Sequence, residues 1–338
     1  MRRLRKHAGI VAGLLALTLV AAACGGDDEG SDDGGGNPTE EVSGSLNISG
    51  SSTVEPVTSL VAEKFQGINP GVEVAVDGPG TSDGFELFCN GETDISDASR
   101  PIEQEEIDAC AANGIEPIEI EVALDALSVV GNPANSVTCL SFGDLYALFG
   151  PESEGIDSWA AADDLAVEVG GNGGLPDEAL TIVAPGEESG TYGSFIEIAL
   201  EAIMEERKQD TVLRPDYQAS ADDNVIIDNA AGTAGGLGFV GFAFAANAGD
   251  TVKSFEVDGG DGCIVASEEN VLNGTYPISR SLFIYVNPNK VTENPAVEPF
   301  VDYYLSDEGI ASAVEVQYFA LPADRLEASR QAWESAKA

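Results

Sequence analysis

The chain has 338 residues, of which 59 are acidic and 15 are basic, and its formal net charge is −44. This charge disfavours nucleic acid and anionic lipid surfaces as partners, because both repel an acidic protein. Its one histidine, His7, lies close to the N-terminus, so histidine-dependent catalysis and histidine metal sites are excluded from the body of the protein. We therefore expect no enzymatic activity, no cofactor and no metal.

The N-terminus has the pattern of an export signal. A basic start, Met1 to Lys6, precedes an apolar run from Ile10 to Ala23 that is too short to span a membrane. The following Ala21-Ala22-Ala23-Cys24 resembles a bacterial lipobox, which predicts cleavage after residue 23 and a lipid on Cys24. The alternative is ordinary signal cleavage nearby, with Cys24 incidental.

Residues 24–44 are rich in glycine and acids, and we expect a flexible tether. The protein is then exported and held on the outer face of the bacterial cell membrane by its lipid alone. Loss of the signal would remove four of the 15 basic residues and leave 11 against 59 acidic ones, a net charge of −48.

The segment after the tether alternates strands and helices. A strand at 46–49, a helix from Val54 to Phe65, a strand at 72–76 and a helix through Phe88 follow one another. A buried strand within 94–102 and a short acidic helix at 103–112 continue the series. This repetition predicts an open, mostly parallel α/β sheet flanked by helices.

A second set of elements begins with a strand at 127–133 that could carry the chain into another lobe. There we expect a strand at 180–184, a tightly packed glycine-rich strand at 235–242, and a helix that faces the core with one set of apolar residues: Phe195, Ile198, Ala199, Ala202 and Ile203. A strand at 276–286 is suited to return the chain to the first lobe. The predicted lobes are 45–127 with 278–338, and 128–277, joined by two crossover strands with the ligand in the cleft.

Four cysteines follow Cys24, and an even number in an exported protein suggests two disulfides. Three pairings are open. We favour Cys89–Cys110, a short local loop, and Cys139–Cys263, which would tie the ends of a central region together. No C-x-x-C spacing occurs, which disfavours a metal site.

Three turns share hydroxyls and glycines ahead of a helix: Gly50 to Thr53, Gly80 to Ser82, and Glu188 to Thr191. Helix N-termini bind oxyanions through unpaired N–H groups, although any single such turn is also an ordinary N-cap. Arg100 follows the strand near residue 97, and its guanidinium could bind two oxygens of a phosphate. The alternative for Arg100 is an ion pair with Asp97 or Glu103.

These turns, together with the segments at 94–102 and 276–280, resemble the periplasmic-type phosphate-binding protein of bacterial high-affinity phosphate ABC importers. The resemblance implies a monomer with a two-lobe fold of type II that closes on inorganic phosphate and delivers it to membrane permease subunits. It also implies the phosphate-binding residues, which are Ser52, Thr53, Val54, Thr81, Ser82, Ser99, Arg100, Ser189, Gly190 and Thr191.

The chain departs from the family pattern at two places. Pro185 stands where many members have an arginine, and Ser99 stands at the position matched to an aspartate that accepts the phosphate proton. Asp97, Asp83 or Glu187 could supply that carboxylate, and Arg280 is expected to be a strand residue paired to an acid near the crossover. The alternatives are a binder of sulfate or molybdate and, less favoured, a secreted phosphatase.

Overall fold

The computed structural model describes residues 42–187 and 189–337. The predicted signal peptide, the lipidation site at Cys24 and nearly all of the predicted tether lie outside these residues. Within them, no helix combines the length and the apolar character needed to cross a bilayer.

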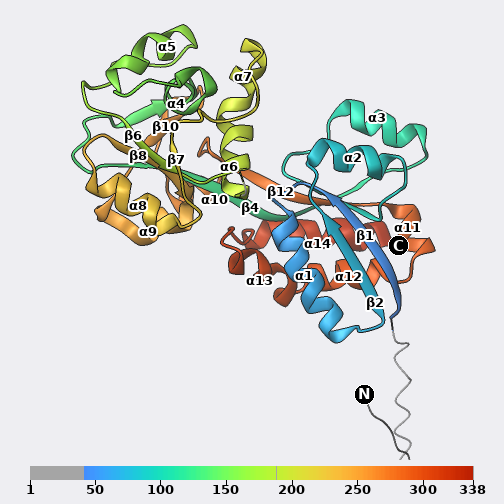
Figure 1. Ribbon diagram of the computed structural model, residues 1–338. Helices are drawn as coiled ribbons and strands as arrows, with labels where there is room; N and C mark the ends of the chain where they lie inside the picture. Colours follow the sequence, from blue (N-terminus) through green and yellow to red (C-terminus); the bar gives the residue numbers. More distant parts are fainter. Residues whose placement is uncertain (1–41, 188, 338) are drawn as a thin grey trace, which may run out of the picture. The chain divides into compact units, whose positions relative to one another are not determined.

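The first group of elements alternates strands and helices, as the sequence predicts (Figure 1). In chain order they are β1 (Gly44–Gly50), α1 (Glu55–Ile68), β2 (Val72–Asp77), α2 (Thr81–Cys89), β3 (Ile95–Ala98) and α3 (Gln104–Ala112). Pro56 lies in the first turn of α1, where the missing N–H costs nothing. The strands β2, β1 and β3 are parallel neighbours in that order.

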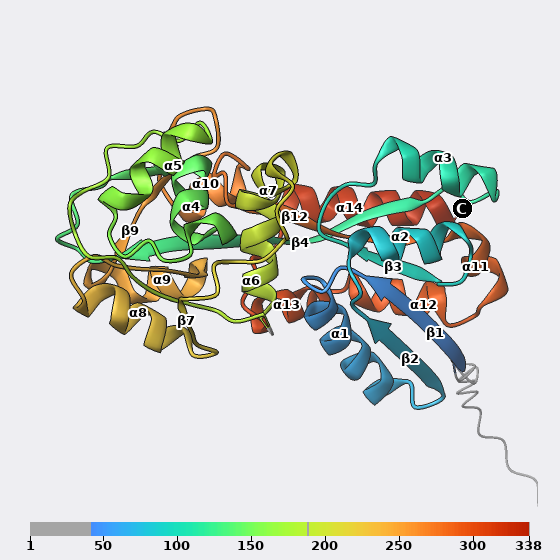
Figure 2. The ribbon, with the colours of Figure 1, turned by 45° about the horizontal axis from the view of Figure 1, so that its top comes forward.

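The chain then leaves through a long strand, β4 (Ile118–Gly131), which begins nine residues before the predicted 127–133 segment. It later returns through β12 (Ser279–Val286), which pairs antiparallel with β4 and with β3. In both ribbon views β4 and β12 run between the helices that surround β1 and β2 and those that surround β6 and β8 (Figure 2). These are the two crossover strands of a two-lobe α/β fold.

The elements between the crossovers build the second lobe. They are β5 (Cys139–Ser141), α4 (Phe142–Phe149), α5 (Asp163–Glu168), β6 (Thr181–Ala184), α6 (Gly190–Phe195), a π-helical turn (Ile196–Leu200), α7 (Glu201–Arg207), β7 (Gln218–Ala219), α8 (Asp223–Gly232), β8 (Gly236–Gly241), α9 (Phe242–Ala248), β9 (Lys253–Ser254), β10 (Glu256–Asp258), β11 (Cys263–Ile264) and α10 (Glu268–Leu272), with three short 3₁₀ turns at 151–153, 160–162 and 249–251. The predicted glycine-rich strand is β8, and it is buried at Gly236 to Val240.

After β12 the chain completes the first lobe with four helices: α11 (Pro288–Glu293), α12 (Val297–Tyr304), α13 (Asp307–Glu315) and α14 (Ala323–Lys337). The main sheet has the strand order β2-β1-β3-β12-β4-β8-β6-β7, with β9 added beside β4. A smaller sheet has the order β11-β10-β5.

The two lobes have separate apolar cores. One core gathers side chains from 46–123 and 282–333, and the other gathers side chains from 126–278. The predicted lobe boundaries, at 127/128 and 277/278, fall in β4 and just before β12; as exact boundaries they stay predictions.

The predicted apolar face of the helix after residue 190 is wrong in part. The buried residues are Phe195, Ile196, Ala199, Leu200 and Met204, while the predicted Ala202 is exposed. The cause is the π-helical turn at Ile196–Leu200, which takes up about one extra residue and rotates the following side chains relative to a regular α-helix.

Both favoured disulfides are present. Cys89, at the end of α2, is bonded to Cys110 of α3, and Cys139 of β5 is bonded to Cys263 of β11. The first holds together the two helices that follow β2 and β3. The second closes the smaller sheet at its outer strands.

Candidate ligand-binding site

The three hydroxyl turns lie where strands end and helices begin. Residues 51–54 lie between β1 and α1, residues 78–80 lie between β2 and α2, and residues 185–187 and 189 lie between β6 and α6. Parallel strands bring such connections to one edge of a sheet, which is where α/β proteins bind ligands. The first two turns belong to the first lobe and the third belongs to the second lobe.

Capping accounts for only one of these turns. Ser189 is the N-cap of α6, and its hydroxyl accepts a hydrogen bond from the N–H of Thr191 at 3.2 Å. The N-caps of α1 and α2 are Val54 and Gly80, and no described side chain caps either helix. The hydroxyls of Thr53, Thr81 and Ser82 are therefore available for other contacts.

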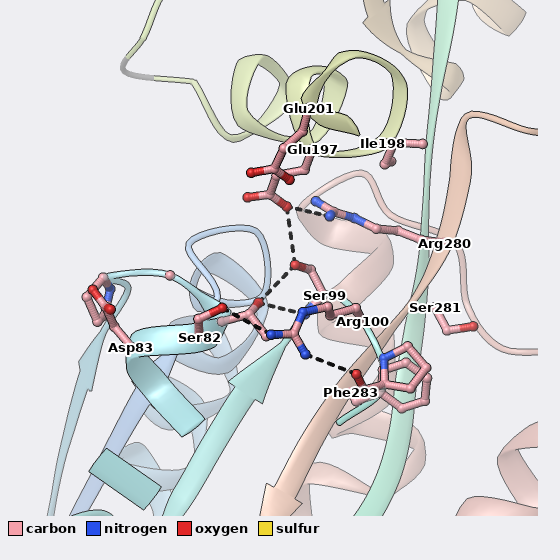
Figure 3. Close-up of a pocket in the computed structure, with 14 residues that line it drawn as sticks. Ser82, Asp83, Ser99, Arg100, Glu197, Ile198, Glu201, Arg280, Ser281 and Phe283 are labelled. Carbon is pink, nitrogen blue, oxygen red and sulfur yellow. Dashed lines mark hydrogen bonds and ion pairs between the residues drawn. The ribbon is translucent and has the colours of Figure 1, made fainter. Parts of the chain in front are cut away.

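A pocket of about 510 Å³ lies at the second turn, and we call it the Arg280 pocket (Figure 3). Its first-lobe wall comes from residues 79–83 and 99–101, and its second-lobe wall from Glu197, Ile198 and Glu201. Arg280, Ser281 and Phe283 of the crossover strand β12 complete it. This pocket brings together four of the predicted site residues: Thr81, Ser82, Ser99 and Arg100.

A second pocket of about 500 Å³, which we call the Ser189 pocket, lies at the first and third turns. Its wall includes Ser52 and Glu55 from the start of α1 and Glu187, Ser189 and Gly190 from the start of α6. The other predicted residues line neither pocket. Thr53 and Val54 are buried, and Thr191 is half-buried.

Arg100 lines the Arg280 pocket and is also paired. Its guanidinium makes a two-pronged ion pair with Glu106 of α3, at 2.8 and 2.9 Å, and donates to the Ser82 hydroxyl at 3.0 Å. Glu103 lies farther away, at 3.5 Å. The predicted ion pair with Glu103 is therefore present at this longer distance, and Glu106, which the sequence did not indicate, makes the closer one. The hydrogen bonds that Arg100 donates to Glu106 raise the pKa of Arg100.

Ser99 and Thr81 connect the two first-lobe loops of the pocket. Ser99 is almost fully buried, its N–H donates to the Thr81 hydroxyl at 3.2 Å, and the two hydroxyls lie 3.0 Å apart. This pair fixes the loop after β3 against the start of α2. Both hydroxyls can still serve an oxyanion, because each has one proton that can rotate away from its present partner and donate to the anion.

Arg280 is a strand residue paired to an acid at the crossover, as expected, and it also reaches the pocket. It lies opposite Asp125 in the β12–β4 register, with 3.7 Å between charged atoms. The same guanidinium donates to the hydroxyls of Thr53 (3.0 Å) and Ser194 (2.9 Å) and to the carboxylate of Glu197. Arg280 therefore contacts both lobes. Burial raises the pKa of Asp125, and Arg280 opposes that shift.

The sequence did not indicate Glu197, Glu201 or Phe283 as pocket residues. Glu197 lies in the π-helical turn and Glu201 begins α7, so their direction depends on the irregular helix. Burial, with the nearby charge of Glu197, raises the pKa of Glu201. No sequence signal distinguishes these glutamates from the many other acidic residues.

The three carboxylates proposed in place of the expected aspartate lie in three different places. Asp83 lines the Arg280 pocket and Glu187 lines the Ser189 pocket. Asp97 lines neither: it is fully buried beneath α1 and accepts a hydrogen bond from Thr58 at 2.9 Å. Burial raises the pKa of Asp97 to about 8, so its carboxyl holds a proton at neutral pH.

Comparison with known proteins decides the family. Residues 35–308 match the family model described as a PBP superfamily domain. The chain belongs to this superfamily. Protein SphX of Synechococcus elongatus is 38% identical over 306 residues, which cover 89% of this chain and 85% of SphX.

The superfamily relatives also include phosphate-binding proteins. The phosphate-binding protein PstS of Staphylococcus epidermidis is 30% identical over 285 residues, and the aligned region covers 84% of this chain and 81% of PstS. The crystal structure of a "possible phosphate binding protein" from Planctomyces limnophilus matches with a TM-score of 0.79 and 32% identity, over 87% of this chain and 99% of that one. The resemblance drawn from the sequence motifs and the two-lobe fold are both confirmed.

Proposed function

We propose that this protein binds inorganic phosphate between its two lobes. The observation that carries the proposal is the Arg280 pocket, whose lining brings together three hydroxyl side chains and two guanidinium groups: Thr81, Ser82, Ser99, Arg100 and Arg280. Hydrogen bonds to a charged acceptor contribute about 1.5–3 kcal/mol each, so several can offset the desolvation of a small dianion. The phosphate-binding relatives support the same ligand.

The first and third turns belong to the same proposal. Residues 52–54 lie at the start of α1 and residues 189–191 at the start of α6, and Ser52, Ser189 and Gly190 line the Ser189 pocket. We propose that closure of the lobes brings these groups onto the anion, which then has donors from both lobes. Water is excluded by the same movement, and the hydrogen bonds gain strength in the drier site.

We further propose that the protein is a monomer that delivers phosphate to the permease subunits of an ABC importer and does not act as an enzyme. The predicted signal and Cys24 support export and a lipid anchor on the outer face of the cell membrane. Mass spectrometry of the protein purified from membranes tests the anchor: a diacylglyceryl group is expected on Cys24, and a free N-terminus at another residue would contradict it.

Calorimetric titration of the ligand-stripped protein with phosphate, repeated in excess sulfate, tests the binding proposal. We expect tight one-to-one binding that sulfate does not reduce. If phosphate gives no heat and sulfate or molybdate binds, the proposed ligand is wrong, although the two-lobe fold is unaffected.

A binder of another tetrahedral oxyanion is the second candidate, and Ser99 favours it. Ser99 lines the pocket at the position matched to the family's proton-accepting aspartate, and a hydroxyl can donate to a fully ionised anion. Calorimetric titration at pH 8 with phosphate, and separately with sulfate, distinguishes the two candidates. At this pH phosphate is mostly HPO4²⁻, which keeps one proton, whereas sulfate has none. A site that requires a proton on its ligand binds phosphate alone, whereas a site for ionised anions also binds sulfate.

A further inference from the structure

A single hydrogen-bonded network joins the two lobes at the Arg280 pocket (Figure 3). The Glu197 carboxylate, from the second lobe, accepts from Arg280 at 2.5 Å and from the Ser99 hydroxyl of the first lobe at 3.4 Å. Both bonds end on the same oxygen, Oε2. Ser99 and Arg280 are also two of the donors that a bound phosphate would use.

The network continues through two further hydrogen bonds of Arg280. Its guanidinium donates to Thr53 of the first lobe and Ser194 of the second, and these two hydroxyls lie 3.3 Å apart. Thr53 and Ser194 are both buried. Arg280 therefore binds polar groups of both lobes from the strand that connects them.

We propose that Glu197 is a built-in competitor for the oxyanion site and a latch between the lobes. Without phosphate, its carboxylate takes the bonds of Ser99 and Arg280 and holds the second lobe against the first. An entering oxyanion displaces it, because one set of donors cannot serve both anions at full strength. This inference rests on the proposed phosphate binding and adds a residue that sets its affinity.

The position of Glu197 suits a group that has to move away. Its side chain is 37% exposed, whereas that of its partner Arg280 is 14% exposed and that of Asp125, the other acid paired with Arg280, is 2% exposed. The Glu197 carboxylate can therefore swing into solvent at little cost, while Arg280 stays in place through Asp125, Thr53 and Ser194. Because the Glu197 side of this ion pair is open to solvent and screened, a phosphate dianion can outcompete it.

Glu197→Gln and Glu197→Ala test the latch in the full chain, and Glu205→Gln is the matched control. Glu205 is an exposed residue of α7 two turns along the same helical segment, so its substitution removes an equal charge without touching Ser99 or Arg280. Two quantities are measured for each protein. One is the distance between spin labels on non-canonical residues at Glu63 of α1 and Asp228 of α8, by pulsed electron paramagnetic resonance. The other is phosphate affinity, by calorimetry.

Without phosphate, both Glu197 variants are expected to show longer and broader inter-lobe distances than the parent, and Glu205→Gln is expected to match the parent. Phosphate affinity should rise about two- to fivefold in the Glu197 variants. Unchanged distances would overturn the latch, and weaker phosphate binding would make Glu197 a ligand contact instead of a competitor. If no protein binds phosphate, the proposed function fails, while the distances still report on the latch.

Discussion

At the scale of single residues, Arg100 shows how a proposed binding group is kept in place. Its guanidinium is fastened by Glu106, which as the third residue of α3 also accepts from the N–H of Glu103. One carboxylate therefore anchors the helix start and orients the arginine. A fixed guanidinium loses less entropy when it binds an oxyanion than a freely rotating one.

Arg100→Ala should weaken phosphate binding at least about tenfold, since a hydrogen bond to a charged acceptor contributes about 1.5–3 kcal/mol. Calorimetric titration measures the affinity, and thermal unfolding of the same sample checks that the variant is folded. An unchanged affinity would make Arg100 a purely structural partner of Glu106.

Asp97 couples stability to pH. Its folded-state pKa is raised to about 8 by burial, from an ordinary value of 3.8, so between these values the folded protein holds a proton that the unfolded chain releases. The contribution of Asp97 is therefore complete below about pH 4 and is lost as the pH rises toward 8, at up to about 1.4 kcal/mol per pH unit.

Asp97→Asn should remove this dependence, because an amide does not titrate. Urea unfolding of the parent and the variant at pH 5, 6, 7 and 8 gives the free energy of unfolding of each protein. As the pH rises, the free energy of unfolding of the parent should fall steadily relative to that of the variant. Parallel pH profiles would show that Asp97 titrates normally.

At the scale of secondary-structure elements, close packing of α2 on β1 places the turn at residues 80–82. A Cβ on Gly84 would lie 2.4 Å from the Cα of Gly50 and 2.9 Å from the carbonyl oxygen of Ser49. Gly50 itself has a positive φ of 153°. Two glycines therefore allow the helix that carries Thr81 and Ser82 to lie directly on the strand before the first turn.

Gly84→Ala should destabilise the protein by about 1–3 kcal/mol, because the helix has to move away from β1. Gly232→Ala in α8 is the matched control: it adds a methyl group where no atom lies within 4 Å, and it should be neutral or stabilising by up to about 1 kcal/mol. Urea unfolding measures both. Equal effects at the two glycines would contradict close packing of α2.

At the scale of the whole molecule, charge opposes the proposed ligand. The full chain carries a net charge of −44, so its long-range field repels a phosphate dianion, and the donors of the pocket attract it only at short range. Salt screens the long-range repulsion more strongly than the short-range attraction, since the Debye length is about 10 Å at 0.1 M ionic strength.

The association rate of phosphate should therefore rise as sodium chloride is increased from about 20 to about 200 mM, a range in which screening becomes effective over molecular distances. Stopped-flow fluorescence of an inter-lobe reporter measures this rate. A rate that falls with salt would show that local positive charge at Arg100 and Arg280 outweighs the net charge.

The sequence alone determined the elements with a clear local pattern, which are the alternating strands and helices of the first lobe, the return strand and the order of the hydroxyl turns. Hydrophobic periodicity and turn residues act over a few neighbours, so a single sequence reveals them. The family motifs added the two-lobe fold. The disulfide pairing followed from loop length, although three pairings were open.

Only the tertiary structure decided which groups meet. Arg100 pairs most closely with Glu106 and at a longer distance with Glu103, whereas Asp97 lies buried beneath α1. Seven of the ten predicted site residues are divided between two pockets. Arg280 joins both lobes through Thr53, Ser194 and Glu197. The π-helical turn after α6 set the direction of Glu197. Such contacts join residues up to 227 positions apart, and their choice among 59 acidic residues depends on packing that no local pattern records.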